Sequence, residues 1–171
     1  MKALILTADG FEDMELFYPL YRMKEENIDV DIAGSIKGEV FGKHGYRVEA
    51  NLTFAQVNPD QYDLLILPGG KGPEKVRLDT DALKITKTMM ESCKVIAAIC
   101  HASQILISAG LVKDKQMTCW QGVRDDLKAA GAHYLDREVV IDGNLITSRM
   151  PDDLPAFCRT IFSVLKIGVE G

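Results

Sequence analysis

The sequence has no hydrophobic run that approaches the length of a membrane-spanning helix. Residues 1–7 are apolar, but they are too few to form the hydrophobic region of a secretory signal peptide. A basic stripe is also missing, and 25 acidic side chains outnumber 20 Lys and Arg to give a net charge of −5. We therefore expect a cytoplasmic protein whose partners include neither a membrane nor nucleic acid.

Cysteine is scarce, with four residues in the chain, and no two of them have the close spacing of a zinc site. The four are Cys93, Cys100, Cys119 and Cys158. Because the sequence shows no secretion signal, we expect reduced thiols and no metal centre.

The chain does contain enough apolar residues for one core. Hydrophobic residues make up 47% of the 171 residues, and charged residues are interspersed among them. No repeat, linker or low-complexity stretch divides the sequence. We therefore predict a single domain, 1–171, that needs no disulfide or metal to be stable.

Short aliphatic runs alternate with amphipathic stretches. Strands are predicted at 2–8, 30–33, 64–67, 95–99 and 116–119, and helices at 11–27, 80–92, 103–109, 123–130 and 152–166. A strand–helix–strand opening favours a doubly wound sheet. The predicted fold class is therefore α/β, a flavodoxin-like, mostly parallel sheet between helices.

Two segments depart from this alternation. Residues 38–50 carry glycines among alternating side chains, which is typical of a small β-arm with turns or bulges. Residues 138–141 and 145–148 flank Asp142-Gly143-Asn144, and these turn residues predict a late hairpin.

The strongest chemical signal is Cys100, which follows the predicted strand 95–99 and precedes the helix 103–109. Open α/β sheets place their chemistry at this carboxyl edge, and a helix N-terminus favours the reactive thiolate. The arrangement has the logic of a nucleophile elbow with Cys in place of Ser. The alternative interpretation is an ordinary buried cysteine, which is common in cores.

His101 is adjacent to Cys100 and could assist proton transfer if its ring turns toward the sulfur. Neighbouring side chains often diverge, so the alternative is a histidine that only caps the helix. The other two histidines, His44 and His133, lie on the arm and near a late loop without catalytic spacing.

Further candidates lie in loops at the same predicted sheet edge. Glu12 and Glu15 follow the first strand, where a carboxylate could contact the cysteine or a substrate, although acidic residues also simply favour helix N-termini. Gly69-Gly70 follows the third strand and could supply oxyanion-hole N–H groups. A phosphate loop is the rival interpretation, but the Gly-Lys-Ser/Thr ending is missing.

Several motifs occur in an order that resembles a known family. They are Phe11-Glu12-Asp13-Met14-Glu15-Leu16, Gly42-Lys43-His44-Gly45, Leu67-Pro68-Gly69-Gly70, Pro73-Glu74-Lys75-Val76-Arg77, Ile99-Cys100-His101, Gln104-Ile105-Leu106, Arg124-Asp125-Asp126-Leu127 and Asp136-Arg137-Glu138-Val139-Val140 with Asp142-Gly143-Asn144. Over essentially the whole chain, the sequence resembles the PfpI family of intracellular cysteine peptidases. That family belongs to the parkinsonism-associated deglycase superfamily and has a class I glutamine-amidotransferase-like fold.

The resemblance implies roles for individual residues. Cys100 matches the nucleophile and His101 the adjacent histidine. Glu74 matches a carboxylate that reaches this histidine from a neighbouring subunit. The alternative for Glu74 is a charged residue of a solvated surface loop.

Supporting roles follow from the same resemblance. Glu15 matches the acidic residue that touches the cysteine sulfur, with Glu12 beside it. Gly70 and His101 match the backbone donors of the oxyanion hole.

The chain departs from the family pattern at three places. Ala102-Ser103 stands where close relatives often have Gly-Pro, Trp120 fills a pocket position where some members carry Tyr, and Met150 stands where some have His. These departures bear on substrate preference more than on the nucleophile.

The resemblance implies a cofactor-free homo-oligomer, built from dimers that form a hexamer in PfpI-like members. The implied activity is that of a cysteine hydrolase acting on peptides or on methylglyoxal-type carbonyls and their adducts, as a peptidase, deglycase or glyoxalase. The alternative is a non-enzymatic stress-response protein, a redox sensor or chaperone that uses oxidation of Cys100.

Overall fold

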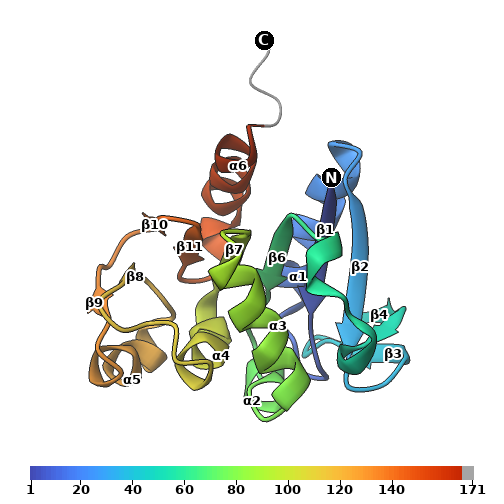
Figure 1. Cartoon of the computed structure of the whole chain (residues 1–171), viewed down its shortest axis with the longest axis horizontal. Helices are drawn as coiled ribbons and strands as arrows, with labels where there is room; N and C mark the ends of the chain where they lie inside the picture. Colours follow the sequence, from blue (N-terminus) through green and yellow to red (C-terminus); the bar gives the residue numbers. More distant parts are fainter. Residues whose placement is uncertain (167–171) are drawn as a thin grey trace.

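The computed structural model describes residues 1–166, and one large sheet forms its centre (Figure 1). In spatial order its strands are β10 (Val139–Asp142), β11 (Leu145–Ser148), β7 (Val95–Ile99), β6 (Leu64–Leu67), β1 (Lys2–Leu6), β2 (Asp29–Gly34) and β5 (Leu52–Thr53). The β10–β11 hairpin is antiparallel and every other neighbouring pair is parallel. The predicted mostly parallel sheet and late hairpin are therefore confirmed.

The central strands are aliphatic throughout because both faces of the sheet are covered. In β6, Leu64 and Ile66 pack into one hydrophobic cluster, whereas Leu65 and Leu67 pack into the cluster on the opposite face. The alternation of side chains along a strand thus feeds two cores at once.

Helices cover both faces of the sheet. The first face packs against α1 (Asp13–Glu25) and α6 (Leu154–Leu165). The second packs against α3 (Thr80–Glu91), α4 (Ser103–Ser108) and α5 (Arg124–Ala129), of which α3 and α4 lie in front of the sheet in Figure 1. This doubly wound arrangement brings the loops after β1, β6 and β7 to one carboxyl edge.

The predicted β-arm is present as the antiparallel pair β3 (Gly38–Phe41) and β4 (Arg47–Ala50). Its turn folds back onto the loop after β1, where Gly42 forms a bridge with Phe11 and the Lys43 N–H donates to the Phe11 carbonyl at 2.9 Å. The arm therefore reaches the edge of the sheet that carries the candidate residues.

Some local elements differ from the sequence expectation. The loop after β6 contains a short helix, α2 (Gly72–Val76), which begins at a proline-containing first turn. The strand expected at 116–119 is limited to β8 (Gln116–Met117), which pairs with β9 (His133–Tyr134) outside the main sheet. Short 3₁₀ turns complete the structure: η1 (Phe54–Gln56), η2 (Pro59–Gln61), η3 (Cys100–Ala102), η4 (Gln121–Val123) and η5 (Pro151–Asp153).

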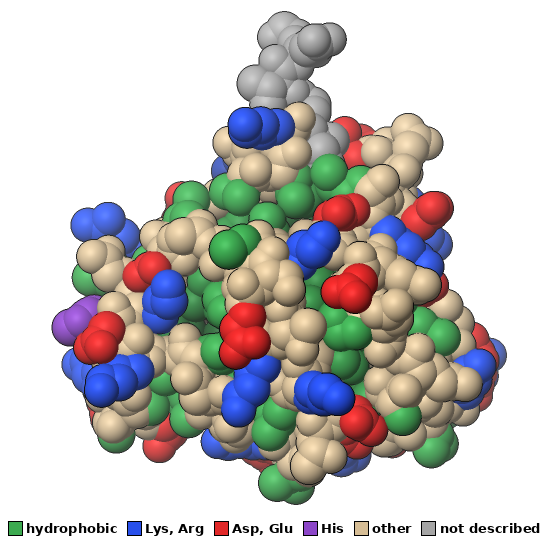
Figure 2. All heavy atoms as spheres, viewed as in Figure 1, with side chains coloured by type: hydrophobic (Ala, Val, Ile, Leu, Met, Phe, Trp, Pro, Cys, Tyr) green, Lys and Arg blue, Asp and Glu red, His purple; other side chains and the backbone are tan. Residues whose placement is uncertain are grey.

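Figure 2 shows basic and acidic side chains interspersed on the face that carries α3 and α4, with apolar atoms between them. The four cysteines are all free thiols, and only Cys93 is exposed. No helix in residues 1–166 combines the length and the apolar character needed to cross a membrane.

Candidate active site

Cys100 lies where β7 turns into η3, at the carboxyl edge of the sheet. Its backbone φ is +63°, in the left-handed region that residues other than glycine rarely adopt. The residue after the strand therefore makes the sharp turn of a nucleophile elbow. The turn continues as the 3₁₀ segment η3, and the helix expected at 103–109 follows it as the six-residue α4.

The His101 ring faces the thiol, with 3.2 Å between its Nδ1 and the Cys100 Sγ. His101 is half-buried, and burial lowers its pKa against the opposing effect of the Glu74 charge. A neutral imidazole at this distance can take the thiol proton.

Glu15 lies beneath the thiol and is completely buried. Its Oε2 accepts a hydrogen bond from the Gly69 N–H at 2.8 Å, and its carboxyl group is within hydrogen-bonding contact of Cys100. Burial raises the pKa of Glu15 to about 8, although the Gly69 N–H opposes the shift. Near neutral pH Glu15 is therefore an uncharged acid beside the sulfur.

The thiol itself differs from the sequence expectation of a low pKa. Burial raises the pKa of Cys100, and the charge of ionised Glu15 raises it further, whereas the His101 and Gly70 N–H groups lower it. The expected helix-end effect is weak because η3 separates Cys100 from a short α4. A protonated Glu15 therefore opposes the thiolate less than an ionised one, and the His101 ring is within hydrogen-bonding distance of the thiol.

The glycine pair after β6 has a steric role. A Cβ added at Gly69 would lie 2.4 Å from the Glu15 Oε2 and 2.7 Å from the Cys100 Cβ. Gly70 has a φ of +81°, and its added Cβ would collide with the backbone after β1. The two glycines therefore allow the Gly70 N–H to face the sulfur together with that of His101.

A cavity of about 380 Å³ opens above Cys100. It brings together all seven residues that the sequence singled out: Cys100, His101, Glu74, Glu12, Glu15, Gly70 and Trp120. Lys43, Lys71 and Pro151 also line it and were given no role from sequence. Lys43 lies inside the Gly42-Lys43-His44-Gly45 motif, which was the available signal for it.

The arm supplies a cation to the cavity. Lys43 Nζ lies 2.8 Å from the Glu12 Oε2, and this pairing raises the pKa of Lys43. His44 Nε2 lies 3.3 Å from the other Glu12 oxygen. Glu12, Asp13 and His44 form a group with metal-ligand spacing, yet the Asp13 oxygens also accept the His44 and Tyr46 N–H groups. These carboxylates therefore already serve to hold the arm.

Glu74 lies on α2 and is exposed at the cavity. Its charge raises the pKa of His101, yet no hydrogen bond joins the two side chains within the part of the chain that the structure describes. Glu74 is thus close enough to act on His101 electrostatically and is free to contact another chain.

Of the three departures from the family pattern, only Trp120 lines the cavity above Cys100. Trp120 stacks on His101 with 6.3 Å between ring centroids. Ala102 and Ser103 are buried beneath the elbow. Met150 lines a separate cavity of about 290 Å³, whereas the following Pro151 lines the cavity above Cys100.

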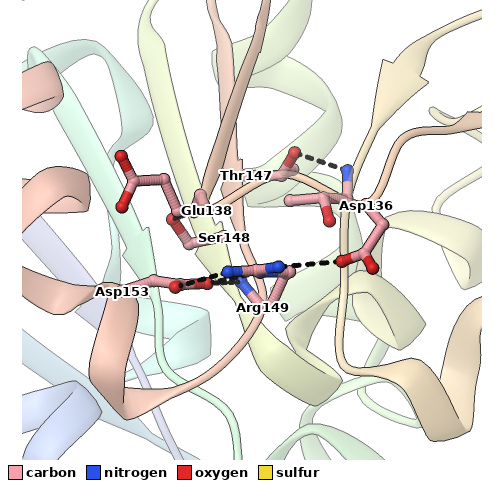
Figure 3. Close-up of polar contacts among 7 residues, drawn as sticks. Asp136, Glu138, Thr147, Ser148, Arg149 and Asp153 are labelled. Atoms are coloured by element: carbon pink, nitrogen blue, oxygen red, sulfur yellow. Dashed lines mark hydrogen bonds and ion pairs between the residues drawn. The ribbon is translucent and has the colours of Figure 1, made fainter.

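Figure 3 shows Arg149 between Asp136 and Asp153, on the two sides of its guanidinium group. The Arg149 Nε and Nη2 donate to the two oxygens of Asp153 at 2.9 and 3.0 Å, and Nη1 donates to Asp136 at 2.8 Å. The Arg149 N–H also donates to Asp153. These bonds fix the turn between β11 and η5, and so fix the wall at Pro151.

The site can be set beside known proteins. Residues 1–164 match the model of the DJ-1/PfpI family. A protein named Deglycase TK1284 from Thermococcus kodakarensis is 52% identical over 166 residues, which cover 97% of this chain and 100% of the relative. Deglycase PfpI from Pyrococcus furiosus is 51% identical with the same coverage.

Solved structures agree with this match. A two-domain protein from Anabaena variabilis, with DJ-1/ThiJ/PfpI-like and ferritin-like domains, superposes with a TM-score of 0.96 at 36% identity. The alignment covers 98% of this chain and 49% of that protein, so this chain spans about half its length. Drosophila melanogaster DJ-1beta superposes with a TM-score of 0.89 at 29% identity, covering 96% of this chain and 89% of that one. By its sequence and fold, the chain belongs to the DJ-1/PfpI family.

Proposed function

We propose that the chain is a cofactor-free cysteine hydrolase of the PfpI type, active as a homo-oligomer. Cys100 is the nucleophile, His101 moves its proton, and Glu74 of a neighbouring copy orients His101. The observation that supports this most directly is the thiol at a left-handed elbow, 3.2 Å from an imidazole nitrogen and at the floor of an open cavity.

The proposed reaction begins with the transfer of the thiol proton of Cys100. His101 takes the thiol proton, and the thiolate attacks the substrate carbonyl, so that a carbon–sulfur bond forms as the carbonyl π bond opens to an oxyanion. The Gly70 and His101 N–H groups are the donors for that oxyanion. With a peptide, the amine leaves with the proton from His101 and a thioester remains.

An α-oxoaldehyde reaches a thioester by another route. The aldehyde carbon forms a thiohemiacetal with Cys100. Loss of the proton on that carbon, with protonation of the neighbouring carbonyl oxygen, gives an enediol, and return of a proton to the neighbouring carbon with loss of the proton on the first hydroxyl gives the thioester of a 2-hydroxy acid. In both routes water attacks the thioester, gives its proton to His101 and releases a carboxylic acid, which restores the thiol. The same residues therefore serve peptides and methylglyoxal-type carbonyls or adducts.

Two observations favour carbonyl compounds and their adducts as the main substrates. The similar proteins from Thermococcus kodakarensis and Pyrococcus furiosus are named deglycases. The cavity of about 380 Å³ is small for an extended peptide, and Trp120 closes one of its walls.

The first experiment compares wild type, Cys100→Ser and Cys93→Ser on methylglyoxal and on a small peptide. Cys100→Ser is expected to reduce turnover of both to background, because a serine hydroxyl is far less acidic than a thiol and His101, whose pKa is lowered by burial, is too weak a base to activate it. Cys93 is exposed, so Cys93→Ser is the matched control and should remain active. Turnover by Cys100→Ser would show that Cys100 is not the nucleophile.

A shared active site is supported by the exposure of Glu74 and by the absence of a hydrogen bond between it and His101 in residues 1–166. Glu74→Gln is expected to lower turnover by about tenfold to a thousandfold, since it weakens general acid–base assistance.

Mixing the inactive Cys100→Ser with the impaired Glu74→Gln tests whether the active site is shared between chains. Cys100→Ser and Glu74→Gln subunits are exchanged after mild dissociation, and exchange is confirmed with differently tagged chains. Partial recovery is expected, because some sites then combine an intact Cys100 with an intact Glu74 of the other chain. No recovery would assign Glu74 to the Cys100 of its own chain.

A redox-sensing or chaperone role for Cys100 is the second candidate, and the open cavity above the thiol favours it. It predicts oxidation of Cys100 by peroxide without turnover of either substrate. Burial raises the pKa of Cys100, which slows direct oxidation of this thiol by peroxide.

A further inference from the structure

The turn at residues 149–153 follows β11 at the carboxyl edge of the sheet, beside the elbow of Cys100. Ser148, the last residue of β11, is in register with Ile99, the last residue of β7. The two segments therefore leave the sheet side by side, and Pro151 of the turn lines the cavity above Cys100. Loops after neighbouring parallel strands form the ligand crevices of open α/β sheets. The position of this turn therefore sets part of the shape of the cavity.

Arg149 and Asp153 bind the two ends of the turn to each other. The guanidinium donates to both Asp153 oxygens, and the Arg149 backbone N–H donates to the same carboxylate at 3.1 Å. The Asp153 N–H donates to the Met150 carbonyl at 3.0 Å. Asp153 is only 4% exposed, so its carboxylate needs these donors. All of these bonds lie within the turn and hold it together.

A further bond joins the turn to another segment. Among the side-chain hydrogen bonds of residues 1–166, the one from the Arg149 Nη1 to Asp136, at 2.8 Å, is the one that leaves residues 149–153 (Figure 3). The Asp136 side chain is 72% exposed. This bond can therefore be removed without leaving a buried carboxylate unpaired.

Asp136 is held by the segment that also carries Trp120. Asp136 follows β9, and the Leu135 N–H donates to the carbonyl of Met117 in β8 at 2.8 Å. The chain continues from β8 to Trp120, whose N–H donates to the Cys100 carbonyl at 3.2 Å. Trp120 lines the cavity above Cys100, as Pro151 does. The bond to Asp136 therefore connects two segments that both form the wall of this cavity.

We propose that Arg149 is a positioning residue that sets the size of substrate the cavity accepts. By binding Asp136, Arg149 holds the turn at a fixed distance from the segment of Trp120. The Pro151 ring then limits the size of the group that a substrate carbonyl can carry, so small α-oxoaldehydes are favoured over longer ones. This inference rests on the proposed function, and its test includes a measurement that needs no turnover.

The first measurement compares methylglyoxal with 2-oxohexanal, which has the same reacting carbonyl groups and a butyl group in place of the methyl group. Initial rates give kcat and KM for both compounds. Asp136→Ala removes the acceptor and should lower the ratio of kcat/KM for methylglyoxal to that for 2-oxohexanal by about three- to tenfold, chiefly through a lower KM for 2-oxohexanal. Asp136→Glu keeps a carboxylate and should restore most of the ratio. A merely structural role would not move this ratio.

Asp125→Ala is the matched control. Asp125 also accepts a hydrogen bond from an arginine, at 2.9 Å from the Arg124 Nε, and its side chain is 82% exposed. Neither residue lines the cavity above Cys100. Asp125→Ala should therefore keep the wild-type ratio.

A double variant tests whether Arg149 acts through Pro151. Pro151→Ala removes the ring and should lower the ratio by itself. If the bond to Asp136 serves to place that ring, Asp136→Ala should change the ratio no further in the Pro151→Ala background.

Alkylation of Cys100 is the measurement that does not depend on turnover. In a Cys93→Ser background, the Cys100 thiolate displaces iodide from iodoacetamide or from the bulkier iodoacetanilide, and mass spectrometry locates the new carbon–sulfur bond. Asp136→Ala should speed the reaction with iodoacetanilide relative to iodoacetamide by about three- to tenfold. If this change appears while neither carbonyl compound is turned over, the proposed function fails and the positioning role is supported.

The proposal would be overturned if Asp136→Ala kept the wild-type ratio in both turnover and alkylation. It would equally fail if Asp125→Ala produced the same change, because the cause would then be the loss of a surface charge. Effects of Asp136→Ala and Pro151→Ala that multiply would also overturn it, because Arg149 would then act on another part of the wall.

Discussion

Cys100 and Cys158 lie in the same hydrophobic cluster, yet only one of them is placed for chemistry. Both are buried, and burial raises the pKa of each, to about 12 for Cys158. Cys158 sits in the middle of α6, where the charge of Arg22 is the one opposing influence on its pKa. Cys100 has a left-handed backbone, two N–H donors, an imidazole and a carboxyl group around its sulfur.

The comparison shows that burial alone does not separate a nucleophile from a core thiol. The difference arises from the groups around the sulfur of Cys100. The Gly70 and His101 N–H groups favour the thiolate, and the His101 ring can accept the thiol proton. Glu15, while it is protonated, adds no negative charge beside the sulfur. The side chains of Glu15 and His101 can be replaced separately, and the backbone at Cys100 can be compared directly with that at Cys158.

The largest expected effect concerns Glu15. Its pKa is raised to about 8 in the folded protein from 4.5, so the folded state holds a proton that the unfolded state loses between these values. Stability must therefore fall as the pH rises from about 4.5 to about 8, by about 3–6 kcal/mol at roughly 1.36 kcal/mol per pKa unit. In Glu15→Gln this loss should disappear.

Urea unfolding of wild type and Glu15→Gln at pH 5 and pH 8, at one protein concentration, measures the effect. Glu91→Gln, an exposed change on α3, is the control and should behave as wild type. Parallel pH profiles for wild type and Glu15→Gln would mean that Glu15 is ionised when folded, and the protonation scheme at Cys100 would be wrong.

The raised pKa of Glu15 also shows which features of the candidate site could be predicted from the sequence and which could not. The strands, the hairpin and the elbow at Cys100 follow from local signals, namely aliphatic runs, turn residues and a strand joined directly to a helix. The pKa of Glu15 depends on Gly69, 54 residues away, and on burial that no local pattern encodes.

The same distinction explains the other differences from expectation. Lys43 reaches the cavity because the arm folds back onto the loop after β1, a contact between distant segments. The helix α2 is short and lies in a glycine- and proline-rich loop, where local signals favour a turn. The residue types of the candidate site were therefore predictable, whereas the electrostatic state of the thiol was not.

The second prediction removes the imidazole. His101→Ala is expected to lower turnover by about 10²–10⁴-fold near neutral pH, because the thiol then has no acceptor for its proton. The control is His133→Ala, which alters an exposed histidine of β9. Wild-type turnover in His101→Ala would assign the proton transfer to another group.

The smallest expected effect is the difference in stability between the glycine and alanine variants at each cysteine. Its sign should be opposite at Cys100 and Cys158, because their backbone conformations differ. At Cys100 the φ of +63° penalises any side chain, so Cys100→Gly should be more stable than Cys100→Ala by about 1–2 kcal/mol. At Cys158, inside α6, glycine loosens the helix, so Cys158→Ala should be the more stable by about 1 kcal/mol. Comparing Gly with Ala at each position cancels most of the lost side-chain packing. Chemical denaturation of the four variants measures both differences, and the same sign at both positions would show that the elbow at Cys100 stores no backbone strain.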